Sequence, residues 1–146
     1  MYIVSACLTG QNCKYNGGNN ECGWVVRFAQ SHSCVLVCPE NCGGLPTPRP
    51  PVEISDGRAA GRDGTDVTGE LAAGAEAAYE TALAAAEAAG ESVEGAILKA
   101  NSPSCGCGKI YDGTFTGRLI DGDGFFAKLL KGKGVAATTE EEVLKW

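Results

Sequence analysis

Three cysteines of this sequence, Cys7, Cys38 and Cys105, each come at or soon after the end of a short apolar segment that is typical of a buried β-strand. Parallel strands that are joined by right-handed crossovers bring their carboxyl ends to the same edge of a sheet. We therefore expect the three thiols to converge at that edge. Convergent thiols are suited to binding zinc, to disulfide exchange or to holding an iron–sulfur cluster.

The surrounding sequence separates these three chemistries in part. Zinc sites usually add histidine or a fourth thiolate, but the only histidine, His32, precedes a predicted strand and is expected at the opposite end of the sheet. Disulfide-exchange enzymes favour a C-x-x-C motif at a helix start, which is absent. Iron–sulfur clusters tolerate scattered ligand spacings, and three ligands on a four-iron cluster leave one iron open. The spacing favours a cluster, with zinc as the alternative.

Glu40 is the main candidate for an acid or base. It stands two residues after Cys38, and the segment that follows contains two glycines and four prolines between residues 43 and 51. Proline fixes φ and removes an N–H donor, so we expect an irregular loop here, neither helix nor inner strand. Such a loop at the carboxyl end of a strand is where α/β proteins place their chemistry. Glu40 is therefore predicted to transfer protons, and the alternative is that it only caps a backbone N–H.

Four other polar residues are candidates for the site. Ser102 is predicted to orient a substrate, or else to be a turn hydroxyl before a proline. Arg49 is a candidate for binding an anionic substrate group, although an ion pair that holds the proline-rich loop is the favoured interpretation. Tyr15 and Asn16 are candidates for lining a base pocket by stacking and hydrogen bonding.

The chain has eight cysteines, which is many for 146 residues. In a reducing compartment they favour metal ligation or thiol chemistry over disulfides. Cys13, Cys42 and Cys107 lie near the predicted site in sequence and are additional ligand candidates. Cys22 and Cys34 are predicted to be small buried apolar residues.

Length and composition narrow the class of protein. The 146 residues suffice for a single domain, 1–146, with one core. A net charge of −6 argues against an extended nucleic-acid footprint, though not against one bound base. No apolar run reaches membrane-spanning length, and the first residues lack the basic and apolar regions of a signal peptide. We therefore expect a cytoplasmic protein with no membrane partner, and the sequence carries no indication of its oligomeric state.

Strand and helix patterns alternate along the chain. Strands are predicted at residues 1–6, 34–37, 96–100 and 134–137, and helices at residues 21–31, 68–90 and 123–132. Thr68 is the predicted N-cap of the long helix, and Thr139 is predicted to begin a terminal helical turn. Two hairpins are predicted at residues 52–61 and 109–120. This order predicts an α/β fold: a three-layer, Rossmann-like domain with a small, mainly parallel sheet and β-hairpin inserts.

Three longer motifs carry a resemblance to a known family. They are SACLTGQNCKYNG at residues 5–17, CPENCGGLPTPR at residues 38–49 and LKANSPSCG at residues 98–106. In these motifs, and in shorter ones at residues 63–68 and 110–115, the chain closely resembles a small bacterial family that includes 2-thiouracil desulfidase. The resemblance covers nearly the whole chain. It implies an oxygen-sensitive [4Fe-4S] cluster that is held by three cysteines, with an open iron that takes sulfur from a thiolated pyrimidine.

The resemblance implies roles for residues that were already candidates. Cys7, Cys38 and Cys105 match the cysteines that hold the cluster, and Glu40 and Ser102 match positions that assist catalysis. Cys13 also matches a family cysteine, so it competes for a ligand role or is a nearby thiol. The chain departs from the usual pattern at Lys14, where arginine is commoner, and in its additional cysteines.

The function expected on this basis is desulfurisation of a small thiocarbonyl compound, such as 2-thiouracil or a related thiolated nucleobase. Water would replace sulfur at the ring carbon without net redox change, so no nicotinamide cofactor is expected, and no dinucleotide-binding glycine fingerprint is present. The alternative is a non-catalytic iron–sulfur or metal-binding protein, either a sensor or a sulfur carrier. A sensor would need neither a pocket beside the open iron nor an acid at Glu40.

Overall fold

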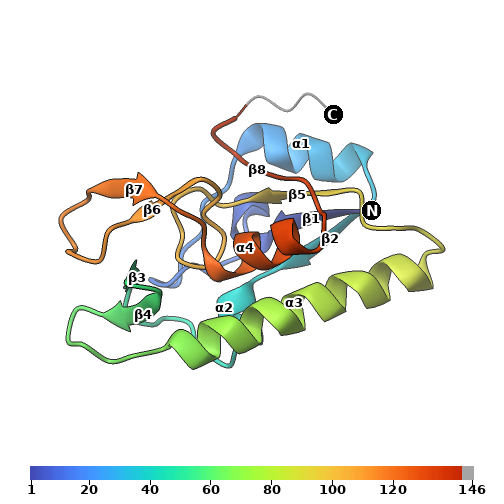
Figure 1. Ribbon diagram of the computed structural model, residues 1–146. Helices are drawn as coiled ribbons and strands as arrows, with labels where there is room; N and C mark the ends of the chain where they lie inside the picture. The colour runs from blue at the N-terminus through green and yellow to red at the C-terminus, as the bar shows by residue number, and fades with distance from the viewer. Residues whose placement is uncertain (143–146) are drawn as a thin grey trace.

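The computed structural model describes residues 1–142. At its centre is a parallel sheet of four short strands in the order β2-β1-β5-β8 (Figure 1). The strands are β1 (Tyr2–Ser5), β2 (Cys34–Val37), β5 (Gly95–Leu98) and β8 (Ala137–Thr139). All three pairings are parallel, so the carboxyl ends of the strands meet at one edge, as predicted.

Helices cover both faces of this sheet. On one face, α1 (Gly23–Ser31) packs its Val25 and Phe28 against side chains from β1 and β5. On the other face lie α3 (Thr68–Ala88) and α4 (Phe125–Gly132), which bury alanines of α3 and the fully buried Phe126 of α4. The alternation of apolar residues along β1 and β5 supplies both cores. The predicted three-layer α/β architecture is therefore confirmed.

Two antiparallel hairpins stand outside the central sheet, beside the carboxyl ends of its strands (Figure 1). One pairs β3 (Val52–Ser55) with β4 (Arg58–Gly61), and the other pairs β6 (Lys109–Tyr111) with β7 (Leu119–Asp121). A small apolar cluster that includes Ile54, Leu71 and Ile110 holds them together. The second hairpin has shorter strands than predicted, and residues 112–118 form the loop between them.

Several sequence predictions are wrong in detail. The segment after Cys38 was expected to be irregular, but it begins with one helical turn, α2 (Pro39–Cys42), because proline at the first position of a helix loses no hydrogen bond. Thr68 starts α3 but does not cap it. Its hydroxyl instead accepts the Ala59 N–H at 2.9 Å, and Asp66 Oδ1 accepts the Thr68 N–H at 2.8 Å.

The predictions for the last strand, the terminal helix and the burial of β2 are also wrong in part. The last strand begins three residues later in the chain than expected, and Thr139 ends it instead of beginning a helix. Residues 140–142 form a turn, and the rest of the predicted terminal helix lies outside the described residues. β2 was predicted to be buried, but only its Val37 is, because β2 is an edge strand of the sheet.

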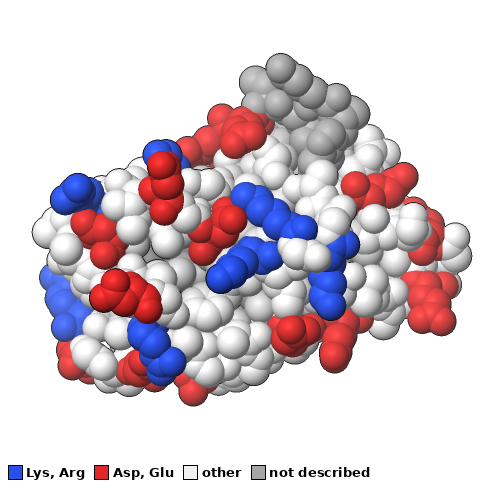
Figure 2. Space-filling model, viewed as in Figure 1, with Lys and Arg blue, Asp and Glu red and all other residues white. Residues whose placement is uncertain are grey.

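Within residues 1–142, no helix has the length and apolarity to cross a membrane. Figure 2 shows basic and acidic side chains interspersed on one face, with a small group of lysines over α4. That face has no continuous basic surface of the kind that follows a nucleic-acid backbone.

Candidate active site

A cavity of about 490 Å³ opens at the carboxyl ends of β1, β2 and β5. Its lining on the sheet side contains four thiols, those of Cys7, Cys13, Cys38 and Cys105. We call the strand-end segments that carry Cys7, Cys38 and Cys105 the cysteine rim. The convergence that was predicted from parallel topology is therefore present.

Cys7 lies in the short 3-10 helix η1 (Ala6–Thr9), directly after β1. The Asn20 side-chain amide donates a hydrogen bond to Cys7 Sγ at 3.5 Å, and the Asn20 N–H donates to the Cys7 carbonyl at 2.9 Å. Burial raises the pKa of the Cys7 thiol, and the neighbouring Cys38 adds to this effect. Asn20 thus holds both the backbone and the sulfur of Cys7 in place.

Cys38 follows β2 and contacts Cys13. Its Sγ lies 3.8 Å from the Cys13 carbonyl oxygen. Hydrogen bonding from the Cys13 thiol, together with an N–H of Asn41 and the charge of Arg49, lowers the pKa of Cys38 to about 6. The same contact with Cys38, together with burial, raises the pKa of Cys13. Cys38 is therefore favoured as thiolate, the form that binds metals.

Cys105 is 5% exposed and lies in the loop that follows β5. The Ser102 hydroxyl oxygen accepts the N–H groups of Ser104 at 3.1 Å and Cys105 at 3.0 Å. Burial raises the pKa of Cys105, and Cys7 and Cys38 are close enough to raise it further. Ser102 therefore has the turn role that was one of its two predictions, and it also lies among the residues that line the cavity.

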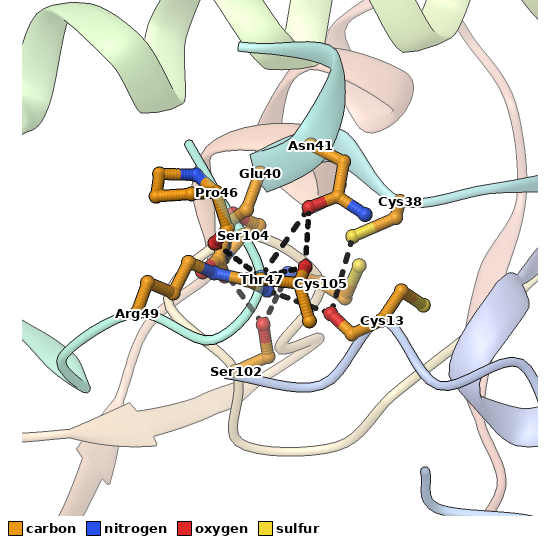
Figure 3. Close-up of polar contacts among 10 residues, drawn as sticks. All are labelled: Cys13, Cys38, Glu40, Asn41, Pro46, Thr47, Arg49, Ser102, Ser104 and Cys105. Atoms are coloured by element: carbon orange, nitrogen blue, oxygen red, sulfur yellow. Dashed lines mark hydrogen bonds and ion pairs between the residues drawn. The ribbon is translucent and has the colours of Figure 1, made fainter. Parts of the chain in front are cut away.

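Glu40 and Arg49 form a nearly buried ion pair beside these thiols (Figure 3). Arg49 Nε donates to Glu40 Oε1 at 2.9 Å, and the two side chains are 6% and 13% exposed respectively. The second carboxylate oxygen, Oε2, accepts the Ser104 hydroxyl at 3.2 Å. Glu40 lies in the first turn of α2, where negative charge is favourable, and it lines the cavity.

Arg49 ties several chain segments together, as its favoured interpretation required. Its remaining N–H groups donate to Cys13 O at 2.9 Å, Thr47 Oγ1 at 3.0 Å, and Asn41 Oδ1 and Pro46 O at 3.3 Å each. A planar guanidinium with five donors can satisfy such a set, and an ammonium cannot. Arg49 thus fixes the proline-rich loop against both the Cys13 loop and α2.

Close packing sets the position of α2 itself. A Cβ atom added at Gly74 of α3 would lie 2.0 Å from the Pro39 carbonyl oxygen, and one added at Gly43 would lie 2.1 Å from the Glu70 carbonyl oxygen. The two helices approach at these positions because neither glycine has a side chain. This contact places Cys38 and Glu40 relative to the core.

The other candidates are less central. Tyr15 lines the cavity and is 40% exposed, whereas Asn16 does not line it and instead accepts the Gly18 N–H at 2.9 Å in a turn. Cys42 is exposed on α2, and Cys107 Sγ donates to Ala137 O at 3.4 Å. Neither of these two cysteines lines the cavity, so their positions do not favour a ligand role.

Sequence reasoning missed one charged pair and part of the cavity lining. Lys99 lines the cavity, and its Nζ pairs with Glu140 Oε2 at 3.1 Å. Both charges act on the pKa of Cys7. The position of Lys99 near the carboxyl end of the strand predicted at residues 96–100 could have identified it, but no local pattern indicates that Glu140 lies beside it. The missed lining residues on the hairpin side include Glu53, Arg62, Tyr111 and Phe115.

The donor set fits a cluster better than a single ion. Among residues 1–142, no three cysteine, histidine or carboxylate side chains are grouped tightly enough to hold one metal ion. A [4Fe-4S] cluster binds each thiolate through a different iron, so its ligands stand further apart. Three thiols from segments that follow three different strands, all lining one cavity, fit that arrangement.

Comparison with known proteins gives three concordant matches. A family model described as 2-thiouracil desulfurase matches residues 2–142. The uncharacterized protein YbbK of Bacillus subtilis (strain 168) is 38% identical over 152 residues, which cover 98% of this chain and 97% of that protein. The solved structure of the [4Fe-4S]-dependent thiouracil desulfidase TudS is similar with a TM-score of 0.85 and 38% identity, over 97% of this chain and 91% of that one.

Proposed function

Because this chain belongs to the 2-thiouracil desulfurase family, we propose that it is a [4Fe-4S]-dependent desulfidase that acts on 2-thiouracil or a related thiolated nucleobase. The reaction replaces the thiocarbonyl sulfur with oxygen from water and releases hydrogen sulfide, with no net oxidation or reduction. When bound, the cluster would supply an open iron as Lewis acid and sulfur acceptor.

The observation that carries this proposal is the placement of three thiols and a buried carboxylate around one cavity. Cys7, Cys38 and Cys105 would hold the cluster, since each follows a different strand and all three line the cavity. Cys13 lies against Cys38 and is the remaining thiol of the lining. Its hydrogen bond to Cys38 would stabilise that residue as thiolate.

Glu40 would move the protons. Its Oε1 forms the ion pair with Arg49 Nε at 2.9 Å. Its Oε2 accepts the longer hydrogen bond of 3.2 Å from the Ser104 hydroxyl. Oε2 is therefore the oxygen that would take a proton from the attacking water and return one to the departing sulfur. Arg49 would hold the carboxylate in position through this exchange.

Ser102 would contact the substrate through its O–H. Its oxygen already accepts two backbone N–H groups, which leaves the proton as the part of the hydroxyl that is suited to donate into the cavity. A hydrogen bond to a ring carbonyl would orient the thiocarbonyl toward the rim. The alternative of a sensor or sulfur carrier explains neither the cavity beside the thiols nor the carboxylate that lines it.

The test is anaerobic purification followed by iron, sulfide and turnover assays on one sample. We expect a brown protein with about four irons per chain, which converts 2-thiouracil to uracil with equimolar sulfide release. Stoichiometric zinc after reconstitution with iron and sulfide would contradict the cofactor. A cluster-replete protein that releases no sulfide from 2-thiouracil or other thiolated nucleobases would contradict the activity.

A further inference from the structure

One carboxylate joins the two hairpins on the side of the cavity that faces the cysteine rim. Glu53, on β3, accepts the N–H of Gly113 and the N–H of Phe115 through the same oxygen, Oε1, both at 3.0 Å. The partners are 60 and 62 residues away in sequence, in the loop between β6 and β7. Glu53 and Phe115 both line the cavity.

The backbone of this loop is held in a conformation that it would not adopt freely. Phe115 has φ of +58°, in the left-handed region that residues with a side chain rarely occupy. Gly113, with φ of +94°, approaches β3 so closely that an added Cβ would lie 2.7 Å from the Ser55 Cβ. Such strain persists only where surrounding contacts enforce it, and it is concentrated at functional sites. The two hydrogen bonds to Glu53 contribute to this, together with those that Asp112 Oδ1 accepts from the N–H and the hydroxyl of Thr114.

The result is an aromatic surface in the cavity wall. The Phe115 ring lies with the Arg62 guanidinium 5.3 Å from its centroid, an arrangement that favours one ring orientation. Tyr111, at the end of β6, lines the same cavity. We call the cavity-lining residues of the two hairpins the hairpin wall; they are Val52, Glu53, Arg62, Tyr111, Phe115 and Gly117.

We propose that Phe115 is the stacking contact for a flat, conjugated thiocarbonyl ring, and that Glu53 is the residue that positions it. The inference deepens the proposed function and rests on it. An aromatic ring offers its π face to any planar base without reading its hydrogen-bonding edge, so it would select for ring-shaped substrates as a class. The reacting sulfur would then be directed to the rim by other groups, Ser102 among them.

The test compares two thiocarbonyl compounds in the cluster-replete enzyme. 2-Thiouracil has a ring that can stack, whereas thiourea carries the same thiocarbonyl without one. We expect Phe115→Leu to raise KM and the dissociation constant for 2-thiouracil about tenfold, with kcat and the constants for thiourea nearly unchanged. Phe115→Tyr should retain wild-type values, and so should Leu119→Ala, which removes an exposed apolar side chain of the same hairpin outside the cavity.

Glu53 is tested by the conservative and the disruptive change. Glu53→Gln keeps a side-chain oxygen that can accept both N–H groups. KM for 2-thiouracil should therefore stay within about threefold of wild type, because neither backbone N–H loses its acceptor. Glu53→Ala should produce the same tenfold rise in KM that is expected for Phe115→Leu, while iron content stays at the wild-type value. If Glu53→Ala fails to fold, the comparison of Phe115→Leu with Phe115→Tyr still decides the stacking role.

Binding of uracil, measured by calorimetry, separates the two proposals. One outcome is that the protein releases no sulfide, but Phe115→Leu still weakens the binding of uracil. This result would contradict the desulfidase activity and support the stacking role. Normal turnover of 2-thiouracil with unchanged KM and affinity in Phe115→Leu would overturn the stacking role and leave the activity supported. If the wild-type holoprotein binds neither uracil nor 2-thiouracil, both the desulfidase activity and the stacking role are overturned.

Discussion

The cysteine rim and the hairpin wall enclose the same cavity but are built differently. The rim starts from the parallel strands, whose backbone hydrogen bonds bring the strand ends to one edge. Side chains then complete it, because Asn20 holds Cys7, Arg49 holds the loops beside Cys38, and the Ser102 hydroxyl holds the turn that carries Cys105. The wall lies outside the sheet, and its loop geometry depends on Glu53, a side chain that accepts two distant backbone N–H groups. The rim is therefore attached directly to the sheet, whereas the wall is attached through contacts between two inserts, of which the Glu53 side chain makes two.

This difference indicates that the rim holds the cofactor and carries the chemical step, whereas the wall binds the substrate ring. Chemistry that needs several groups at fixed separations is best supported on a rigid sheet, where each group is anchored by the frame. Recognition of a ring tolerates small displacements and can be carried by a separately packed insert. Changes in the rim should therefore remove the cofactor or the chemical step, whereas changes in the wall should alter substrate affinity with the cofactor retained.

The largest effect is expected from the rim thiols. Cys7→Ser, Cys38→Ser and Cys105→Ser should each abolish the cluster, measured as iron content and charge-transfer absorption, because three ligands leave none to spare. Cys22→Ser and Cys34→Ser, which change thiols outside the cavity, should leave the cluster intact. Loss of the cluster in Cys42→Ser or Cys107→Ser with retention in Cys105→Ser would show that the ligand assignment is wrong. Loss of the cluster in Phe115→Leu would show that the rim and the wall do not have separate roles.

The next effect is expected at Glu40. Glu40→Gln keeps the volume of the side chain but cannot exchange protons, so turnover should fall by about 10²–10⁴-fold with iron content unchanged. Removing the charge opposite Arg49 should also cost about 1–3 kcal/mol of the free energy of unfolding. Rates are therefore compared well below the unfolding midpoint, with Glu70→Gln as a control on α3 outside the cavity. A cluster-replete Glu40→Gln enzyme with the wild-type rate would refute the proton-transfer role.

Arg49 and Arg58 provide a comparison between a buried arginine with several acceptors and an exposed arginine that pairs with Asp66. Each donates through Nε to a carboxylate, but Arg49 is 6% exposed and Arg58 is 66% exposed. Arg49→Lys keeps the positive charge but loses most of the hydrogen bonds that the guanidinium donates. It should therefore lower the free energy of unfolding, measured by urea titration, by about 2–4 kcal/mol. Arg58→Lys should produce no measurable change, since exposed ion pairs add little. Equal effects of the two changes would argue that Arg49 does not organise the rim.

The smallest effect concerns the contact between α2 and α3. Gly74→Ala places a methyl group against the Pro39 carbonyl and should cost about 1–3 kcal/mol of the free energy of unfolding. Gly69→Ala adds the same methyl group to the same helix, where nothing lies within 4 Å, and should stabilise the protein by up to about 1 kcal/mol. If α2 transmits its position to the rim, Gly74→Ala should also lower iron incorporation. Unchanged incorporation would limit this contact to a stabilising role.

The sequence by itself determined the frame of this protein. Apolar strands that alternate with helical patterns predict a parallel α/β sheet, and parallel topology alone brings Cys7, Cys38 and Cys105 to one edge. Glu40 and Arg49 were identified because a thiol, a carboxylate and a proline-rich loop follow one strand. These inferences succeed because they depend on local composition and on a topological rule, both of which can be read along the chain. The extent of the domain over residues 1–146 and the cytoplasmic location stay predictions.

Only the tertiary structure decided how the cavity is completed. Glu40 meets Arg49 and Ser104, Lys99 meets Glu140, and Glu53 meets the Phe115 loop, across separations of up to 64 residues. The exclusion of Cys42 and Cys107 from the lining is of the same kind, because one helical turn at Pro39 directs Cys42 outward. No local pattern encodes these contacts. They arise when hairpins and loops pack together, and the partner of a polar group is then chosen by geometry in space and not by position in the sequence.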